Sequence, residues 1–161
     1  MSYEQSISMP IELLQQINRN IEGIESAPKD APSNYAAAKM PMALVWESQG
    51  ENSGQIGLAR TDRNFIIEVL VAPSTTKFVA ANFNTTRQLL GRMLDTYMAL
   101  YSDVEEYILD YGDPSGVRVQ IDKSKPITDS GAEPALEVLP EVYYYGFRIS
   151  IPMIVRWGSE L

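Results

Sequence analysis

The sequence contains no cysteine and no histidine. Without cysteine the chain forms no disulfide, offers no thiolate to a metal and has no cysteine nucleophile. Without histidine it lacks the usual imidazole base and the commonest ligand of transition metals. Catalysis by a serine–histidine pair is therefore excluded.

Long apolar runs are also missing. No stretch approaches the roughly 20 apolar residues that a helix needs to cross a bilayer. The segment Met1–Met9 is polar and has neither the basic nor the apolar region of a signal peptide. We therefore expect a soluble chain that is made in a cytoplasm and does not contact membranes.

Positive charge is scarce, because 13 Lys and Arg stand against 21 Asp and Glu, for a formal net charge of −8. A field of that sign repels polyphosphates, which disfavours a protein that grips nucleic acid. The length of 161 residues suits one domain, and the charges are spread without an acidic tail or a basic arm. The sequence thus predicts a single domain over residues 1–161.

Two segments have the periodicity of amphipathic helices. From Pro10 to Ile24 apolar residues recur at steps of three and four, and Pro10 suits a first helical turn. A second apolar stripe runs from Leu89 to Ile108. Before it, Thr85–Gln88 fits a capping box with Thr85 as the N-cap. We expect this second helix to extend from about Thr86 to Asp110.

Three segments before the C-terminal stretch predict strands, at Met42–Glu47, Asn64–Ala72 and Gly116–Asp122. The second is apolar on both faces, which predicts a central place in the sheet. Ser48–Gly57 is rich in glycine and predicts a loop, as does the proline-containing segment Lys123–Glu141. With a strand at the C-terminus, the element order predicts an α+β fold with a mostly antiparallel sheet of about four to five strands, packed by two main helices.

The C-terminal segment Tyr143–Trp157 alternates, with apolar odd positions and mostly polar or small even ones. Fifteen extended residues span about 50 Å, whereas a globule of this size is about 40 Å wide. The strand must therefore bend at Gly146 or Pro152, consist of two strands, or project and pair with a neighbour. Pro152 favours a bulge or an edge, and a partner subunit would cover such an edge.

Motifs that could carry chemistry are weak. The glycines of Ser48–Gly57 faintly resemble a phosphate loop, but no Lys-Ser/Thr pair follows them. Acids within Asp103–Asp113 could hold Ca²⁺ or Mg²⁺, yet their spacing matches no EF-hand. The run Tyr143–Tyr145 could stack on bases, but no basic patch accompanies it. We expect two of these rings in the core and Tyr144 outward at an interface.

Several segments together carry a resemblance to a known family: MPMALVWE at Met40–Glu47, NFIIEVLVA at Asn64–Ala72, the long helix after Thr86, and YYYGFRISIPMIVRW at Tyr143–Trp157, with its Tyr-x-Gly step. In order and spacing, over most of its length, the chain resembles the tail terminator proteins of long-tailed bacteriophages. The resemblance implies a structural virion protein at the head-proximal end of the tail, assembled in the host cytoplasm. Such a protein would not be an enzyme and would need no cofactor, which agrees with the absence of histidine and cysteine. Such proteins form a six-membered ring on the tail tube, stop its growth, and offer a surface to head-completion and connector proteins. DNA would pass through the lumen without being bound specifically.

Within such a ring we expect a set of polar and aromatic residues at interfaces. Arg148 and Arg156 lie on the polar face of the last predicted strand and could pair with acids of an adjoining subunit. The predicted loops Ser48–Gly57 and Pro73–Asn84 would meet neighbouring rings or the lumen. The full set of expected interface residues is Arg148, Arg156, Tyr144, Ser150, Asn52, Ser53, Thr75 and Lys77.

Two other classes remain open at this point. A head–tail connector or minor tail component would also be non-enzymatic, but would differ in ring size and partner. A small enzyme that uses carboxylates, or a ligand-binding domain, would be a monomer with a deep acidic pocket. A hexamer in solution favours the terminator, and a twelve-fold ring favours the connector.

Overall fold

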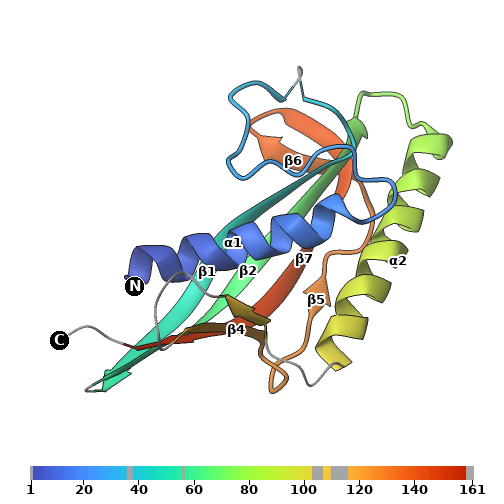
Figure 1. Cartoon of the computed structure of the whole chain (residues 1–161). Helices are drawn as coiled ribbons and strands as arrows, with labels where there is room; N and C mark the ends of the chain where they lie inside the picture. The colour runs from blue at the N-terminus through green and yellow to red at the C-terminus, as the bar shows by residue number, and fades with distance from the viewer. Residues whose placement is uncertain (1, 36–37, 56, 103–106, 110–115, 159–161) are drawn as a thin grey trace.

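The computed structural model describes residues 2–35, 38–55, 57–102, 107–109 and 116–158. Two helices, α1 (Tyr3–Arg19) and α2 (Ala80–Ser102), pack on one face of a seven-stranded sheet (Figure 1). The strands are β1 (Met42–Gln55), β2 (Leu58–Pro73), β3 (Tyr107–Leu109), β4 (Val117–Ile121), β5 (Thr128–Asp129), β6 (Glu133–Leu139) and β7 (Val142–Trp157). All strand pairs are antiparallel, so the predicted α+β class is confirmed.

Helix α1 begins at Tyr3, and the prediction that it begins at Pro10 is wrong. Ser2 is the N-cap: its hydroxyl accepts from the Gln5 main-chain N–H, while the Gln5 side chain accepts from the Ser2 N–H. This reciprocal capping box fixes the first turn. Pro10 instead lies inside the helix, where it is buried.

The predicted loop Ser48–Gly57 is mostly strand. β1 continues to Gln55 and pairs with β2 to form a long hairpin, whose register shifts between Glu47 and Gly50. Gly50 leaves room for the Arg63 side chain, whose Cζ lies 2.7 Å from the position a Cβ would take. Glycine at this position thus permits a strand where composition alone favours a loop.

Strand β7 is continuous over 16 residues and is paired along both of its edges. β2 covers one edge, and β4, β5 and β6 follow one another along the other. The Pro152 carbonyl accepts a hydrogen bond from the Asp122 N–H. Because a strand residue points its N and its C=O to the same side, the Pro152 nitrogen, which carries no hydrogen, faces the gap between β4 and β5. The alternative that β7 is an edge covered by a partner subunit is therefore wrong, because the same chain covers it.

The strands that cover β7 come from the segment Lys123–Glu141, which was predicted to be a loop. Two short strands, β5 and β6, lie there and pair with β7. Together with β3 they explain why the sheet has seven strands rather than four or five. β6 is mostly exposed, with no sustained apolar alternation, which is why composition did not reveal it.

Helix α2 begins at Ala80, five residues before the predicted cap. The Thr85 hydroxyl donates to the Ala81 carbonyl within the helix instead of capping it. The helix ends at Ser102, and Ile108 belongs to β3, opposite Arg118. The predicted extension to Asp110 is therefore wrong at Tyr107–Leu109, and the rest of it lies outside the described residues.

The main core lies between the helices and the sheet. Leu89, Met93 and Tyr97 of α2 pack in one cluster with the odd-numbered residues of β7 from Tyr145 to Trp157. That cluster also includes residues of α1, β2 and β4. A second, smaller cluster lies on the other face of the sheet, and it consists of Met42, Leu44, Leu70, Leu136 and Tyr144.

A buried polar network ties the helices to the sheet within the main core. The Tyr97 hydroxyl donates to the Asn18 side-chain oxygen at 2.5 Å, and the Asn18 amide donates to Gln15 at 3.1 Å. Gln15 in turn donates to the carbonyls of Pro28 and Ala43. Because buried polar groups are costly when unpaired, this network fixes α1 and α2 in one arrangement on the sheet.

Candidate assembly surface

The face of the sheet away from the helices carries charged side chains in register, and we call it the open face. Arg60 of β2, Arg156 of β7 and Arg118 of β4 lie directly opposite one another on three adjacent strands. We call these three residues the arginine row. Arg118 is exposed, and Arg60 and Arg156 are partly exposed. Like charges placed directly opposite each other in a sheet repel one another.

Carboxylates next to the row offset part of its charge. Arg60 Nε donates to Asp62 Oδ1 at 2.6 Å, and Arg60 also contacts the second oxygen of that carboxylate at 2.9 Å. This hydrogen bond holds the pKa of Asp62 below its usual value, and the positive charges of Lys125 and Arg156 lower it further. One carboxylate thus lies among several cations at this end of the sheet.

A hollow of about 360 Å³ lies beside the arginine row. The end of the β1–β2 hairpin and two of the arginines line it: Ser53, Gly54, Leu58, Ala59, Arg60 and Arg156. Leu58 is 63% exposed there, which is the largest value among the exposed large apolar residues. Guanidinium groups, a hydroxyl and an exposed leucine together suit a protein surface that carries carboxylates.

The neighbouring edge of the sheet is formed by β1. Within the described ranges β1 pairs only with β2, apart from one bridge between Met42 and Ser26. The Ala43 N–H points away from β2 and donates to the Ser26 carbonyl. Alternate residues of a strand point their N–H groups to the same side, so those of Val45 and Glu47 also point away from β2. An edge of this length is a template for pairing with another chain.

Two of the expected interface residues, Ser53 and Arg156, line the hollow. Asn52 does not, because its side chain lies on the helix-covered face, where it accepts a hydrogen bond from the buried Thr61. Arg60 and Arg118 complete the arginine row, and sequence reasoning missed both of them. Alternation places each on a polar face, but only the register of β2 and β4 against β7 brings them together.

Arg148 lies elsewhere on the open face and has a partner in its own chain. Its Nε donates to Glu68 Oε2 at 2.6 Å, and the Glu68 side chain is 5% exposed. Burial raises the pKa of Glu68, although the hydrogen bond from Arg148 opposes that shift. Arg148 therefore supports the fold, and the expectation that it pairs with a second subunit is not favoured. Ser150 is opposite Thr128 of β5.

Tyr144 is buried, so its predicted outward position at an interface is wrong. It is 5% exposed and belongs to the second cluster, where Tyr35 contacts its ring edge to face at 6.5 Å between centroids. Side chains of β6 and of the segment that contains Tyr35 pack against this part of the even-numbered face and cover it. Alternation assigned Tyr144 to the correct face but could not reveal that cover.

Thr75 and Lys77 are exposed in the segment between β2 and α2, at the other end of the sheet from the hairpin turn (Figure 1). The Ser74 N–H donates to the Tyr143 carbonyl, which joins this segment to the start of β7. Large apolar side chains are exposed on both segments, namely Phe78, Val79, Leu139, Val142 and Tyr143. This end of the sheet is therefore apolar, whereas the hairpin end is rich in arginine.

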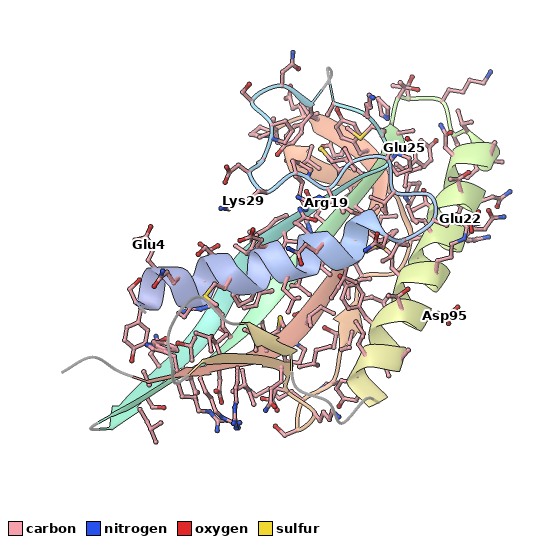
Figure 2. All side chains as sticks on the ribbon, in the orientation of Figure 1. Glu4, Arg19, Glu22, Glu25, Lys29 and Asp95 are labelled. Carbon is pink, nitrogen blue, oxygen red and sulfur yellow. The ribbon has the colours of Figure 1, made fainter. Side chains whose placement is uncertain are left out.

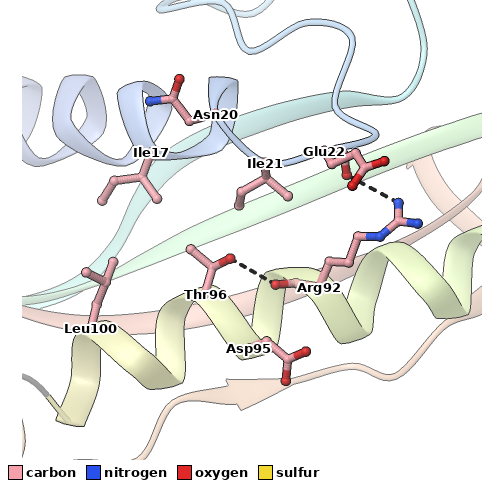
Figure 3. Close-up of a pocket in the computed structure, with 8 residues that line it drawn as sticks. All are labelled: Ile17, Asn20, Ile21, Glu22, Arg92, Asp95, Thr96 and Leu100. Atoms are coloured by element: carbon pink, nitrogen blue, oxygen red, sulfur yellow. Dashed lines mark hydrogen bonds between the residues drawn. The ribbon is translucent and has the colours of Figure 1, made fainter.

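The helical side offers a groove of about 500 Å³ between the end of α1 and α2, shown in Figure 3. Arg92 of α2 crosses it and donates to the Glu22 carbonyl, while Thr96 donates within α2. Asp95 points away from Glu22, so the two carboxylates do not form a pair. Other charged side chains of this side, including Glu4 and Lys29, point outward in Figure 2.

The described residues form neither a cluster of metal ligands nor a membrane-spanning helix. In the ranges that the structure describes, no three acidic side chains gather as a cation site. The acids of Asp103–Asp113, which were candidates for Ca²⁺ or Mg²⁺, lie outside those ranges. No described helix has the length and apolar character required to span a membrane.

No model of a known protein family matches the chain, and no curated protein matches its sequence.

Proposed function

We propose that this chain is a structural virion protein that forms a ring of identical subunits, with six as the expected number, at the head-proximal end of a bacteriophage tail tube. The ring ends polymerisation of the tube and offers its far side to head-completion and connector proteins. The proposal rests on the resemblance to tail terminators and on one structural observation. That observation is the long outer edge of β1 beside the arginine row.

The β1 edge supports assembly because an open strand edge favours pairing with another chain. β1 has 14 residues, and its outer N–H and C=O groups face away from β2. Proteins usually shorten, charge or cover such an edge. Repeated head-to-tail contacts between unlike surfaces would close a ring, and would cover this edge once in each subunit.

The charge of the chain supports a conduit for DNA rather than a DNA-binding protein. A formal net charge of −8 repels phosphates, so DNA would pass through the lumen without being held. The arginine row is local, and the Asp62 carboxylate beside it binds Arg60. No catalytic step is part of this proposal.

Two measurements test the proposal. Native mass spectrometry over a range of concentrations should detect a hexamer, and a twelve-fold ring would favour a head–tail connector instead. Particles assembled without the protein should carry overlong tails, and the wild-type chain supplied in trans should restore a uniform length. Tails of normal length without the protein would overturn the proposal, as would a monomer that turns over a small molecule.

A further inference from the structure

We propose that the outer edge of β1 pairs with an extended segment of a second copy of this chain, and that Arg63 binds a carboxylate of that segment. The inference rests on the proposed ring and specifies the chemistry of one contact within it. Two features meet at this place, the unpaired edge of β1 and an arginine side chain that lies over β1 without an acidic partner among the described residues.

Arg63 of β2 reaches across β1 at the margin of the helix-covered face. It is directly opposite Met153 of β7, which belongs to the main core, and directly opposite Gly50 of β1. Its Cζ occupies the space that a side chain at Gly50 would fill, and its Nη1 donates to the Ser48 carbonyl at 2.9 Å. The guanidinium group therefore lies over the strand that forms the edge of the sheet.

The hydrogen bonding of Arg63 is incomplete within the part of the chain that the structure describes. A guanidinium group carries several N–H donors, and described residues supply Arg63 with one acceptor, the Ser48 carbonyl. Its Nε is buried without a partner, and no described carboxylate forms an ion pair with it. Arg63 as a whole is partly exposed, so its terminal nitrogens can receive an outside acceptor. A carboxylate is the acceptor that matches a planar guanidinium group best.

The main chain of β1 beside Arg63 is accessible to another strand. The N–H groups of Val45 and Glu47 point away from β2, and no described residue accepts a hydrogen bond from them. Val45 is partly exposed and Glu47 is exposed. An extended segment that pairs here gains main-chain hydrogen bonds and turns alternate side chains to each face of the sheet. A side chain of that segment beside Gly50 would meet the Arg63 guanidinium.

A second copy suits this edge because of its charge and its backbone. The chain has 21 acidic residues against 13 basic ones, so a neighbouring copy offers an excess of carboxylates to Arg63. A nucleic acid cannot supply the alternating N–H and C=O groups with which a strand edge pairs. In a head-to-tail ring each copy gives one segment and receives one, so the edge of every β1 is covered.

Cross-linking without a spacer identifies the partner of Arg63. Arg63→Lys keeps the positive charge and supplies an amine, which a carbodiimide joins to a carboxylate in contact with it. In a mixture of isotopically labelled and unlabelled protein, a cross-link between one labelled and one unlabelled peptide must join two chains. We expect such mixed pairs, with an Asp or Glu of the second copy on the introduced amine. Arg87→Lys, the same exchange at an exposed position of α2, is the control and should give no enrichment of mixed pairs.

Two further variants separate the side-chain contact from the strand pairing. Arg63→Met should weaken self-association about tenfold or more in sedimentation velocity, because the partner carboxylate loses its hydrogen-bonded cation. Glu47→Pro removes an N–H that points away from β2, so it should keep the hairpin and weaken association by a similar factor, about tenfold or more. Glu47→Gln removes the same charge but keeps the N–H, and should associate like the wild type. Circular dichroism and thermal unfolding should show that all three variants fold.

Hydrogen exchange provides a readout of the pairing itself. In the assembled wild type the amides of Val45 and Glu47 should exchange at least about tenfold more slowly than in the monomer, because each edge N–H is then covered. In Arg63→Met at the same concentration the two amides should exchange as in the monomer.

The outcomes distinguish this contact from the proposed function. If wild-type rings form but Arg63→Lys gives no mixed pairs and Glu47→Pro assembles like Glu47→Gln, the contact is wrong while the function stands. If the introduced amine joins only a tail tube protein, the edge binds the tube and the second copy is the wrong occupant. If dimers with mixed pairs form but never rings, the contact stands and the ring is wrong. If the chain stays monomeric in solution and on tail tubes, both fail.

Discussion

Phe147 and Arg148 are consecutive residues of β7 that point to opposite faces of the sheet, and their surroundings differ completely. Phe147 is fully buried beneath the helices in a continuous apolar cluster. Arg148 lies on the open face, partly exposed, in an ion pair with Glu68. Farther along the strand the same alternation buries Val155 and places Arg156 in the arginine row. One face thus maintains the fold, while the other presents charge to the surroundings.

This comparison shows how one strand can have two roles. Residues of the helix-covered face are buried in the core of their own chain, so changes there should act on stability. Residues of the open face differ among themselves, since Glu68 is buried and paired whereas Arg118 is exposed. We therefore expect effects on stability to decrease from the covered face to the arginine row, where effects on assembly should dominate.

The largest effect should come from the covered face. Phe147→Ala should lower the free energy of unfolding by about 3–5 kcal/mol, because Phe147 is fully buried and its truncation leaves a cavity. Urea-induced unfolding followed by circular dichroism measures this loss. Ile151→Val on the same face is the matched control and should cost about 0.5–1.5 kcal/mol. Equal losses in the two variants would contradict the role assigned to Phe147.

The next effect tests the ion pair of the open face. Arg148→Met should cost about 1–3 kcal/mol at neutral pH, because it leaves the buried Glu68 carboxylate without its partner. Burial already raises the pKa of Glu68. Its protonation in the folded state therefore becomes favourable as pH falls, and the cost of Arg148→Met should shrink with it. The same unfolding experiment at neutral and mildly acidic pH measures this change.

The double variant Glu68→Gln/Arg148→Met serves as the control for that ion pair. It removes both charges, so it should recover part of the stability lost in Arg148→Met and should lose the dependence on pH. No recovery would mean that the alkyl part of Arg148, rather than its charge, maintains this region.

A smaller effect tests the buried network of the covered face. Tyr97→Phe should cost about 0.5–1.5 kcal/mol, because it removes the hydroxyl that donates to Asn18 and leaves a buried acceptor unpaired. Hydrogen exchange should also speed up at the end of α1, where Asn18 lies. If stability is unchanged, the network does not hold α1 and α2 together.

The smallest effect on stability belongs to the arginine row. Arg60→Gln should cost less than about 1 kcal/mol, since the pair with Asp62 is partly solvated. The pKa of Asp62, now held below its ordinary value of 3.8, should rise towards that value, and NMR titration of the carboxyl carbon measures this shift. A carboxyl whose pKa is lowered by folding stabilises the fold above its ordinary pKa and loses that contribution as pH falls. An unchanged Asp62 titration would contradict the ion pair.

Much of the local structure was readable from the sequence because alternation and helical periodicity are local signals. From Tyr145 to Trp157 the odd-numbered residues of β7 are buried as their alternation predicted, and the stripe that includes Leu89 and Tyr97 faces them. Tyr143, which was expected in the core, is exposed. The apolar character of Asn64–Ala72 correctly indicated a central strand, between β1 and β7. The α+β class followed from these elements.

Errors occurred where a distant segment changed the surroundings of a residue. Tyr144 is on the expected face but is buried by the second cluster. The glycine-rich end of β1 is a strand because β2 pairs with it, and β7 is not an edge because β4, β5 and β6 cover it. Polar composition and a proline favour loops and edges, but hydrogen bonds from another strand overrode both preferences.

The sequence alone determined the alternation of β7, the apolar stripes of the helices and the excess of acids, because each of these is a property of residues close together in the chain. Only the tertiary structure decided that Arg60, Arg156 and Arg118 lie in one row, because their meeting depends on the register of three strands. Register is fixed by the packing of the whole sheet against its helices, and a shift of one residue in β2 or β4 would turn its arginine to the covered face.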